Sequence, residues 1–169
     1  MGDHAEGIKM KTKAEQALEI FKHAEGKELG VSEWQEIAQE RINQFADATL
    51  DHQFIHTDPD RAAKLSPYKT TIAHGFLTLS LIPHLNKSVP QLDPKTTEGL
   101  VMGINYGLDK VRFSAPVKVN AHVRSRVELI SAELKSPNTI QLKHRVTIEI
   151  KGEEKPGCVA ETLSRLVYE

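Results

Sequence analysis

The chain has 169 residues, the length of one ordinary domain, and 39% of them are hydrophobic, which is enough to bury a core. Its 22 Lys and Arg residues nearly balance 23 Asp and Glu residues, and the formal net charge of -1 argues against nucleic acid as the main partner. The single cysteine, Cys158, excludes an intrachain disulfide and a zinc site built from cysteines.

Neither a membrane span nor an export signal is visible in the sequence. No apolar run approaches the roughly 20 residues that cross a bilayer. The segment from Met1 to Lys13 is charged and lacks the apolar core of a signal peptide. We therefore expect a cytoplasmic protein without membrane contact. We also expect residues 1–10 to be disordered or a tag, and residues 11–169 to form one domain.

Helical patterns dominate the first third of the chain. From Thr12 onward, small and apolar residues recur at spacings of three and four, which predicts an amphipathic peripheral helix. A short edge strand is expected at 32–37 and a second helix at 39–48. Asp58 followed by Pro59 predicts the start of a further short helix, because aspartate caps the free N–H groups and proline suits the first turn.

The segment 72–85 is the most apolar of the chain, and its leucines and isoleucines fall on nearly every helical face. This pattern predicts a helix buried all round, which Pro83 should kink or end. The second half instead alternates apolar and polar residues, which is typical of strands. Strands are expected at 122–129, 140–151 and about 158–168, with one or two more in 100–119. Together these elements predict an α+β fold, an antiparallel sheet packed around the apolar helix.

An ionisable cluster lies in the polar stretch before this helix, which we expect to be a loop between 49 and 58. Asp51 and His56 are five residues apart, and in a loop both can face one water molecule. Such a pair can deprotonate water and later return a proton, because histidine titrates near neutrality. The alternative is that Asp51 caps a turn and His56 bonds only to the backbone.

A metal site is a weaker interpretation of the same stretch. His52, His56, Asp58 and Asp60 are ligand types that zinc accepts. The spacing lacks the glutamate and the third ligand of a helical zinc motif, so no metal is expected. Among the other histidines, His144 falls on the apolar side of its strand, where we expect a neutral imidazole with satisfied hydrogen bonds.

His74 and Gly75 open the apolar helix. The first N–H groups of a helix have no internal partner, and a glycine there lets a ligand carbonyl approach closely. This predicts an oxyanion site, with close helix–sheet packing as the alternative role of Gly75. The glycine patterns of serine hydrolases, dinucleotide-binding enzymes and phosphate-binding loops are absent from the sequence, which argues against those classes.

Three segments in this order, 45–60, 71–83 and 104–117, resemble the MaoC-like dehydratases, which include (R)-specific enoyl-CoA hydratases and the nodulation-protein-N-like group. The resemblance covers about 29–167. It implies the hot-dog fold, in which an antiparallel sheet wraps a central helix.

The resemblance also implies roles for individual residues. Asp51 and His56 take the catalytic positions, and the N–H of Gly75 takes the position that meets the thioester carbonyl. The implied substrate-binding residues are Gln53, Ala73, His74, Leu79 and Pro83. Lys110 and Arg112 join them if these basic residues attract the phosphates of CoA; the alternative is that they are solvated charges on a strand. Leu50 stands where the family usually has glycine, and a positive φ there would strain the turn. Asn120 also replaces a usual glycine, but asparagine tolerates that conformation better.

The activity implied is (R)-specific hydration of trans-2-enoyl-CoA, or dehydration of (R)-3-hydroxyacyl thioesters carried by CoA or acyl carrier protein. The implied assembly is a homodimer or a higher homo-oligomer, and neither a metal nor a redox cofactor is required. A thioesterase with the same fold and a non-catalytic acyl-CoA-binding module remain as alternatives.

Overall fold

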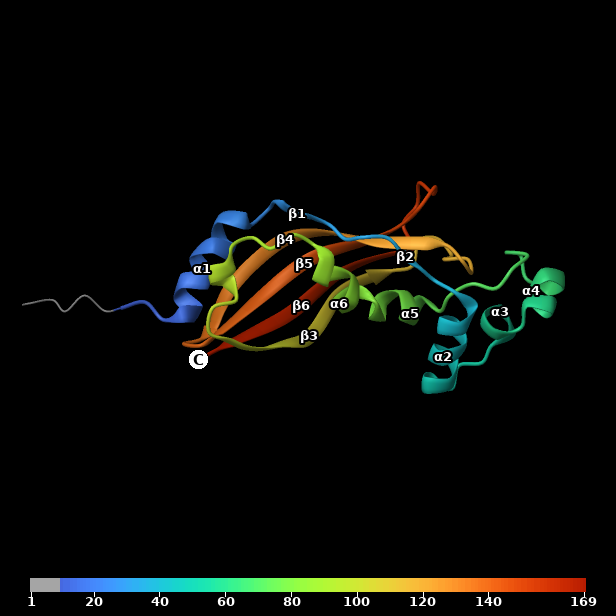
Figure 1. The fold of residues 1–169 in the computed structure, drawn as a ribbon, viewed down its shortest axis with the longest axis horizontal. Coiled ribbons are helices and arrows are strands. Elements are labelled where there is room, and N and C mark those ends of the chain that lie inside the picture. Colours follow the sequence, from blue (N-terminus) through green and yellow to red (C-terminus); the bar gives the residue numbers. More distant parts are fainter. Residues whose placement is uncertain (1–9) are drawn as a thin grey trace, which may run out of the picture.

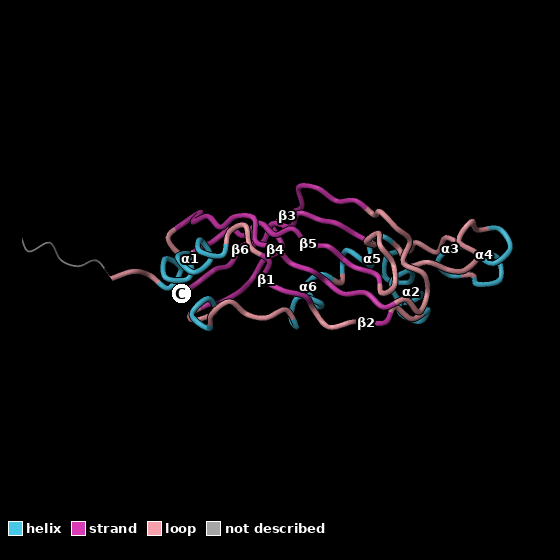
Figure 2. The backbone as a smooth tube through the Cα atoms, turned by 90° about the horizontal axis from the view of Figure 1, so that it is seen from above, coloured by secondary structure: helices cyan, strands magenta, loops and turns pink. Residues whose placement is uncertain are grey.

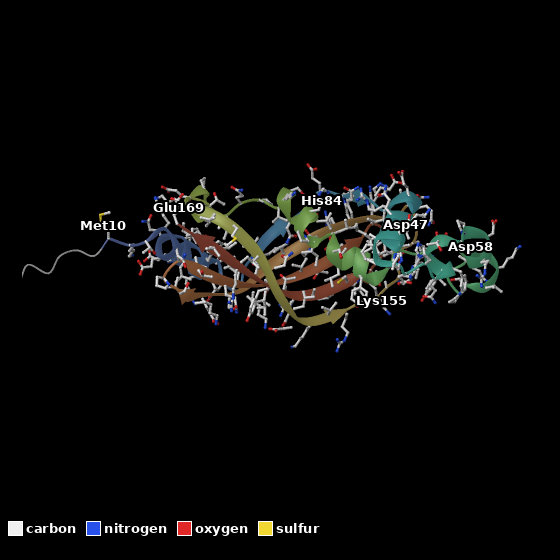
Figure 3. The ribbon with its side chains drawn as sticks, turned by 90° about the horizontal axis from the view of Figure 1, so that it is seen from below. Met10, Asp47, Asp58, His84, Lys155 and Glu169 are labelled. Atoms are coloured by element: carbon white, nitrogen blue, oxygen red, sulfur yellow. The ribbon has the colours of Figure 1, made fainter. Side chains whose placement is uncertain are left out.

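The computed structural model describes residues 10–169, so most of the segment 1–10 lies outside the described residues. The molecule is elongated, with a sheet between two helical ends (Figure 1). One end carries the first helix, α1 (Lys13–Ala24), and the C-terminus. Figure 3 shows Met10 and Glu169 toward this end and Asp47 and Asp58 toward the other.

The sheet is antiparallel, as expected, and its strands run lengthwise between the two ends (Figure 2). Its order is β1-β4-β5-β6-β3, and the short β2 also pairs with β4. The strands are β1 (Glu28–Val31), β2 (Gln35–Glu36), β3 (Leu100–Arg112), β4 (His122–Ser136), β5 (Thr139–Ile150) and β6 (Cys158–Tyr168). The edge strand expected at 32–37 is only the two-residue β2, and β1 just before it was not expected. The one or two strands expected in 100–119 are the single strand β3.

The amphipathic helix expected from Thr12 onward is confirmed. The structure adds a capping box: the Thr12 hydroxyl accepts from the N–H of Glu15, and the Glu15 carboxylate accepts from the N–H of Thr12, so two free N–H groups are satisfied. The buried face of α1 packs on one part of the sheet around Leu129 and Tyr168. Because its apolar stripe is covered there, α1 forms a second, smaller core.

The central helical segment is shorter and more exposed than expected. It begins at Gly75 and consists of α5 (Gly75–Ser80) and α6 (Ile82–Leu85), with the break at Leu81, just before the proline. The expectation of burial all round is wrong, because the Phe76 side chain is 68% exposed. Apolar periodicity could not reveal this, since no neighbouring element covers that face. The buried side chains of this segment, Leu77, Leu81, Ile82 and Leu85, pack with residues of β4, β5 and β6 in the main core.

Three helices form the far end: α2 (Gln39–Thr49), α3 (Phe54–Thr57) and α4 (Pro59–Leu65). The Asp58 carboxylate caps α4 by accepting from the N–H of Arg61, as expected. The expected loop before it instead contains α3, a single helical turn too short to show a periodic pattern. Two 3-10 turns, η1 (Asn86–Ser88) and η2 (Pro94–Thr96), complete the linker to β3. Within residues 10–169 no helix is both long and apolar enough to cross a membrane.

Candidate active site

The backbone around His56 fixes the orientation of its ring. His56 lies on α3 and is only 7% exposed, and its Nδ1 is 2.7 Å from the carbonyl oxygen of Ile72. The segment is clamped further, because the N–H of Ile72 donates to the carbonyl of Ile55. Since a carbonyl can only accept, Nδ1 carries the proton and Nε2 keeps a free lone pair.

The surroundings also keep the His56 ring neutral. Burial lowers its pKa from the ordinary 6.5, and the neighbouring His74 lowers it further. The hydrogen bond to Ile72 and the charge of Asp51 act in the opposite direction without reversing the shift. At neutral pH, His56 therefore presents a basic nitrogen that can accept a proton.

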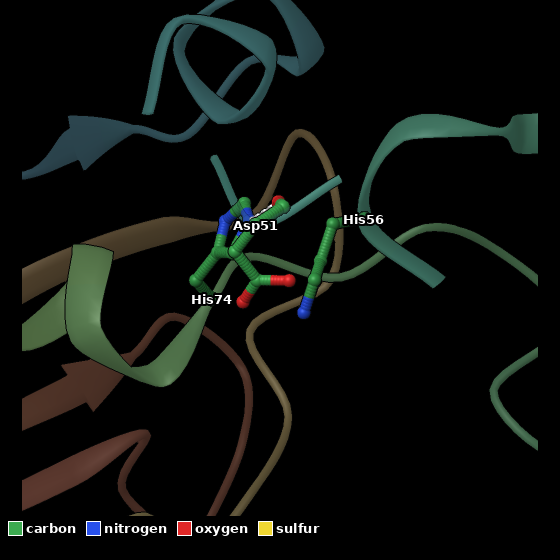
Figure 4. A group of neighbouring side chains, drawn as sticks. All are labelled: Asp51, His56 and His74. Atoms are coloured by element: carbon green, nitrogen blue, oxygen red, sulfur yellow. Dashed lines mark hydrogen bonds between the residues drawn. The ribbon is translucent and has the colours of Figure 1, made fainter. Parts of the chain in front are cut away.

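His74 connects the start of α5 to the Asp51 loop. Its side chain is 2% exposed, and its Nε2 donates to the backbone carbonyl of Asp51 over 2.9 Å, the bond drawn in Figure 4. The ring stacks on His56 with 3.9 Å between ring centroids, and the ring of Phe45 lies 4.9 Å away. Its Nδ1 is buried without a hydrogen-bond partner. His74 thus holds both catalytic candidates in place, a role that the spacing of the sequence did not indicate.

The Asp51 carboxylate is exposed and lies beside a ring nitrogen of His56 (Figure 4). Asp51, His56 and His74 each contribute one side-chain oxygen or nitrogen to a group of three atoms that lie within 4.8 Å of one another. Asp51 reaches this position because α2 ends in the left-handed conformation at Leu50, with φ 64°. Leu50 therefore has the positive φ that would strain the turn, and Asn120 also has a positive φ, 65°.

Gly75 offers a free backbone N–H group beside His74, a member of this cluster. It is the first residue of α5, directly after His74, and its N–H has no hydrogen-bond acceptor within the described chain. It lines a cavity of about 250 Å³ together with Ile72, Thr78 and Phe113. A Cβ at this position would lie 2.9 Å from the Phe113 ring, so the backbone here is also closely packed.

The other expected substrate residues lie in different places. Leu79 and Pro83 line one cavity of about 490 Å³, further along the same helical segment. Ala73 is buried, and its N–H donates to Val117, whereas Gln53 is exposed at the start of α3.

Lys110 and Arg112 are exposed on β3, and Val111 between them packs toward the core. Since side chains alternate along a strand, the two basic groups point away from that core. Arg112 donates to the carbonyl of its neighbour Val111. The two basic groups therefore lie on the exposed side of β3, more than fifty residues from Asp51 and His56 in the chain.

Sequence reasoning missed two residues that line the 490 Å³ cavity, Asn86 and His144. His144 is neutral as expected, because burial lowers its pKa to about 4. Its ring makes no hydrogen bond to other groups within residues 10–169, and burial is the only influence on its pKa. Asn86 gave no signal because it lies in a linker that only the fold brings to the cavity.

The alternative metal cluster does not form. His52 pairs with Asp47, with 2.8 Å between His52 Nε2 and Asp47 Oδ1, and Asp58 is used as a helix cap. The group of Asp51, His56 and His74 has suitable ligand types, but Nε2 of His74 donates to a backbone carbonyl, which leaves only its Nδ1 as a ligand atom.

A buried imidazole, an adjacent carboxylate and a free N–H at a helix start thus form a candidate acid–base site at one end of an antiparallel sheet. The family described as MaoC like domain matches residues 21–150. The chain is 48% identical over 144 residues to 3-hydroxyacyl-thioester dehydratase Z of Mycobacterium tuberculosis, covering 85% of this chain and 91% of that protein. It is 45% identical over 145 residues to Nodulation protein N of Rhizobium leguminosarum bv. viciae, covering 85% and 87%.

A solved structure of R-hydratase PhaJ1 from Pseudomonas aeruginosa superposes with a TM-score of 0.62 at 25% identity, covering 83% of each chain. The hot-dog fold expected from the resemblance is therefore confirmed. The chain belongs to the MaoC-like dehydratase family.

Proposed function

We propose that this protein hydrates trans-2-enoyl-CoA to the (R)-3-hydroxyacyl thioester, or catalyses the reverse dehydration. The observation that carries the proposal is the lone pair of His56 Nε2, held beside the Asp51 carboxylate in a cluster with His74, whose chain neighbour Gly75 offers a free N–H. Two of the similar proteins support it: one relative is named a 3-hydroxyacyl-thioester dehydratase, and one solved structure is that of an R-hydratase.

In the proposed reaction, one water molecule is bound between Asp51 and His56. The pair removes one proton from this water as its oxygen forms a bond to C3 of the enoyl group. The electron pair of the C2–C3 double bond moves toward the thioester, and the negative charge develops on the carbonyl oxygen. The pair then returns one proton to C2, so that the enzyme ends in its starting protonation state.

Gly75 is assigned to the charge that develops in this step. Its N–H donates to the carbonyl oxygen, and the interaction strengthens as that oxygen becomes negative. The 250 Å³ cavity that Gly75 lines offers room for the thioester group. The acyl chain then follows the helical segment into the 490 Å³ cavity beside Leu79 and Pro83.

We also propose that the protein assembles as a homodimer through β3. This strand has 13 residues and is the last in the sheet order, so one edge of it is unpaired. It exposes a row of apolar side chains, namely Val101, Met102, Ile104, Tyr106 and Leu108. An edge of this length and composition is normally covered by a partner. Light scattering should give twice the chain mass of 18.9 kDa, and a monomer at micromolar concentration would contradict the proposal.

Incubation with crotonyl-CoA tests the proposed reaction. Hydration removes the enoyl absorbance without releasing free thiol, and chiral analysis of the product should give the (R)-3-hydroxy form. Release of free thiol would instead identify a thioesterase. Binding without either change would identify a non-catalytic acyl-CoA-binding module.

A further inference from the structure

The cavity assigned to the acyl chain does not end in apolar side chains. Beyond Leu79 and Pro83 it reaches Asn86 and His144. A second cavity of about 230 Å³, under the linker between α6 and β3, is lined by the same two residues. Asn86 and His144 therefore stand where the two cavities meet. None of the side chains lining either cavity is an Asp, Glu, Lys or Arg.

His144 offers both a donor and an acceptor at this junction. It lies in the middle of β5, opposite Leu129 on β4 and Thr162 on β6, and it is partly buried. Its ring makes no hydrogen bond within residues 10–169, and burial alone determines its titration. A neutral imidazole carries one N–H and one lone pair, so His144 can donate one hydrogen bond and accept another.

Asn86 adds further donors on the facing side. Its Oδ1 accepts from the hydroxyl of Ser125 over 2.8 Å, which fixes the amide with its Nδ2 turned away from that bond. The Nδ2 group has no acceptor among the described residues. Its N–H groups are thus available to a ligand in the cavity.

An unsubstituted alkyl chain is a poor occupant of this junction. It would displace water from His144 and Asn86 without replacing the hydrogen bonds, and a buried polar group left unpaired is unfavourable. A carboxylate is also a poor occupant, because no lining side chain is a cation and the nearby Arg165 guanidinium stacks on the Tyr106 ring. A hydroxyl or a ketone matches neutral donors and acceptors without bringing a charge.

We propose that the acyl group carries an uncharged oxygen, a hydroxyl or a ketone, remote from the thioester, and that His144 and Asn86 bind it. The inference rests on the proposed function for the direction in which the acyl chain runs. Asn86 follows Gly75 by eleven positions, roughly 16 Å at the helical rise of 1.5 Å per residue. A crotonyl group is too short to span this distance, so it reports on the chemistry and not on the junction.

The test compares two matched series of trans-2-enoyl-CoA thioesters of increasing length, one unsubstituted and one with a terminal hydroxyl. Once the chain reaches the junction, wild-type protein should prefer the hydroxylated thioester by about 10-fold or more in kcat/KM. His144→Leu should lose this preference or reverse it. His144→Gln, which keeps a neutral donor and acceptor, should retain part of it. His122→Leu, which replaces an exposed histidine outside both cavities, serves as the matched control and should retain all of it.

The preference is a ratio within one variant, so a general loss of activity does not mimic the effect. The same ratio is measured by calorimetric binding in Asp51→Asn protein, which gives the answer even if hydration is not the reaction. Equal affinity for both series, or an unchanged preference in His144→Leu, would overturn the inference while leaving crotonyl-CoA hydration intact. Absence of crotonyl-CoA hydration with a retained binding preference would instead overturn only the proposed function.

Discussion

Leu50 provides a quantitative test of how the turn directly before Asp51 is stabilised. This residue has φ 64° and ψ 21°, directly before Asp51, in a conformation that costs an L-residue with a Cβ about 1–2 kcal/mol. Replacement by glycine removes that cost but adds about 0.5–1 kcal/mol of lost chain freedom on folding. The side chain is 81% exposed, so its removal sacrifices little buried surface.

The balance predicts that Leu50→Gly raises the free energy of unfolding by about 0.5–1 kcal/mol, or a Tm increase of roughly 1–4 °C for a chain of this size. Urea denaturation at one fixed protein concentration measures it, since association would otherwise change the result. Leu50→Ala keeps the Cβ and should change stability little. Asn120→Gly, at φ 65°, should gain less than Leu50→Gly, because asparagine tolerates this conformation.

Turnover of Leu50→Gly should not fall, because glycine keeps the turn that positions Asp51. Two results would refute the reasoning: a lower free energy of unfolding in Leu50→Gly, or an equal gain in Leu50→Ala. The first would show that leucine makes stabilising contacts, and the second that the side chain rather than the backbone is responsible.

Three further predictions concern His144, Gly75 and the basic residues of β3. The pKa of His144 is about 4 in the folded protein against 6.5 ordinarily, so the unfolded state binds more protons between these values and stability falls as pH drops from 6.5 toward 4. The pKa difference allows a loss of at most roughly 3 kcal/mol in the free energy of unfolding. His144→Leu should remove this part of the acid dependence, and identical pH profiles of stability in the two proteins would contradict the prediction. Gly75→Ala should lower kcat/KM for crotonyl-CoA by about 10-fold or more by obstructing the carbonyl; full recovery in Gly75→Ala/Phe113→Ala would show that the glycine serves packing alone. Lys110→Ala/Arg112→Ala should raise KM for crotonyl-CoA at low salt but not for a pantetheine thioester; an equal rise on both substrates would refute a role in binding phosphate.

Local signals predicted much of this fold. The apolar periodicity of α1, the aspartate cap of α4 and the alternation along β4 and β5 each depend on neighbours in the chain, and each is confirmed. The turn α3 was missed because four residues cannot display a helical period. The exposure of Phe76 was missed because it depends on which other elements cover α5.

The candidate site likewise combines features that have a local signal in the sequence with features that have none. The spacing of Asp51 and His56 indicated an acid–base pair, and the structure brings the two side chains together. The hydrogen bonds that fix them involve Ile72 and His74, which are distant in sequence from their partners. Those contacts, and the unpaired ring of His144, follow from tertiary packing and have no local signature.

The central claim is that Asp51 and His56 act together on one water molecule. Crotonyl-CoA hydration should be measured for Asp51→Asn, His56→Ala and the double variant, with circular dichroism to confirm that each is folded. Each single change should lower turnover by at least about 100-fold, and the double variant should be little worse than the poorer single variant. Near-normal turnover in both single variants would contradict the account, and strictly multiplicative losses in the double variant would show that the two residues act separately.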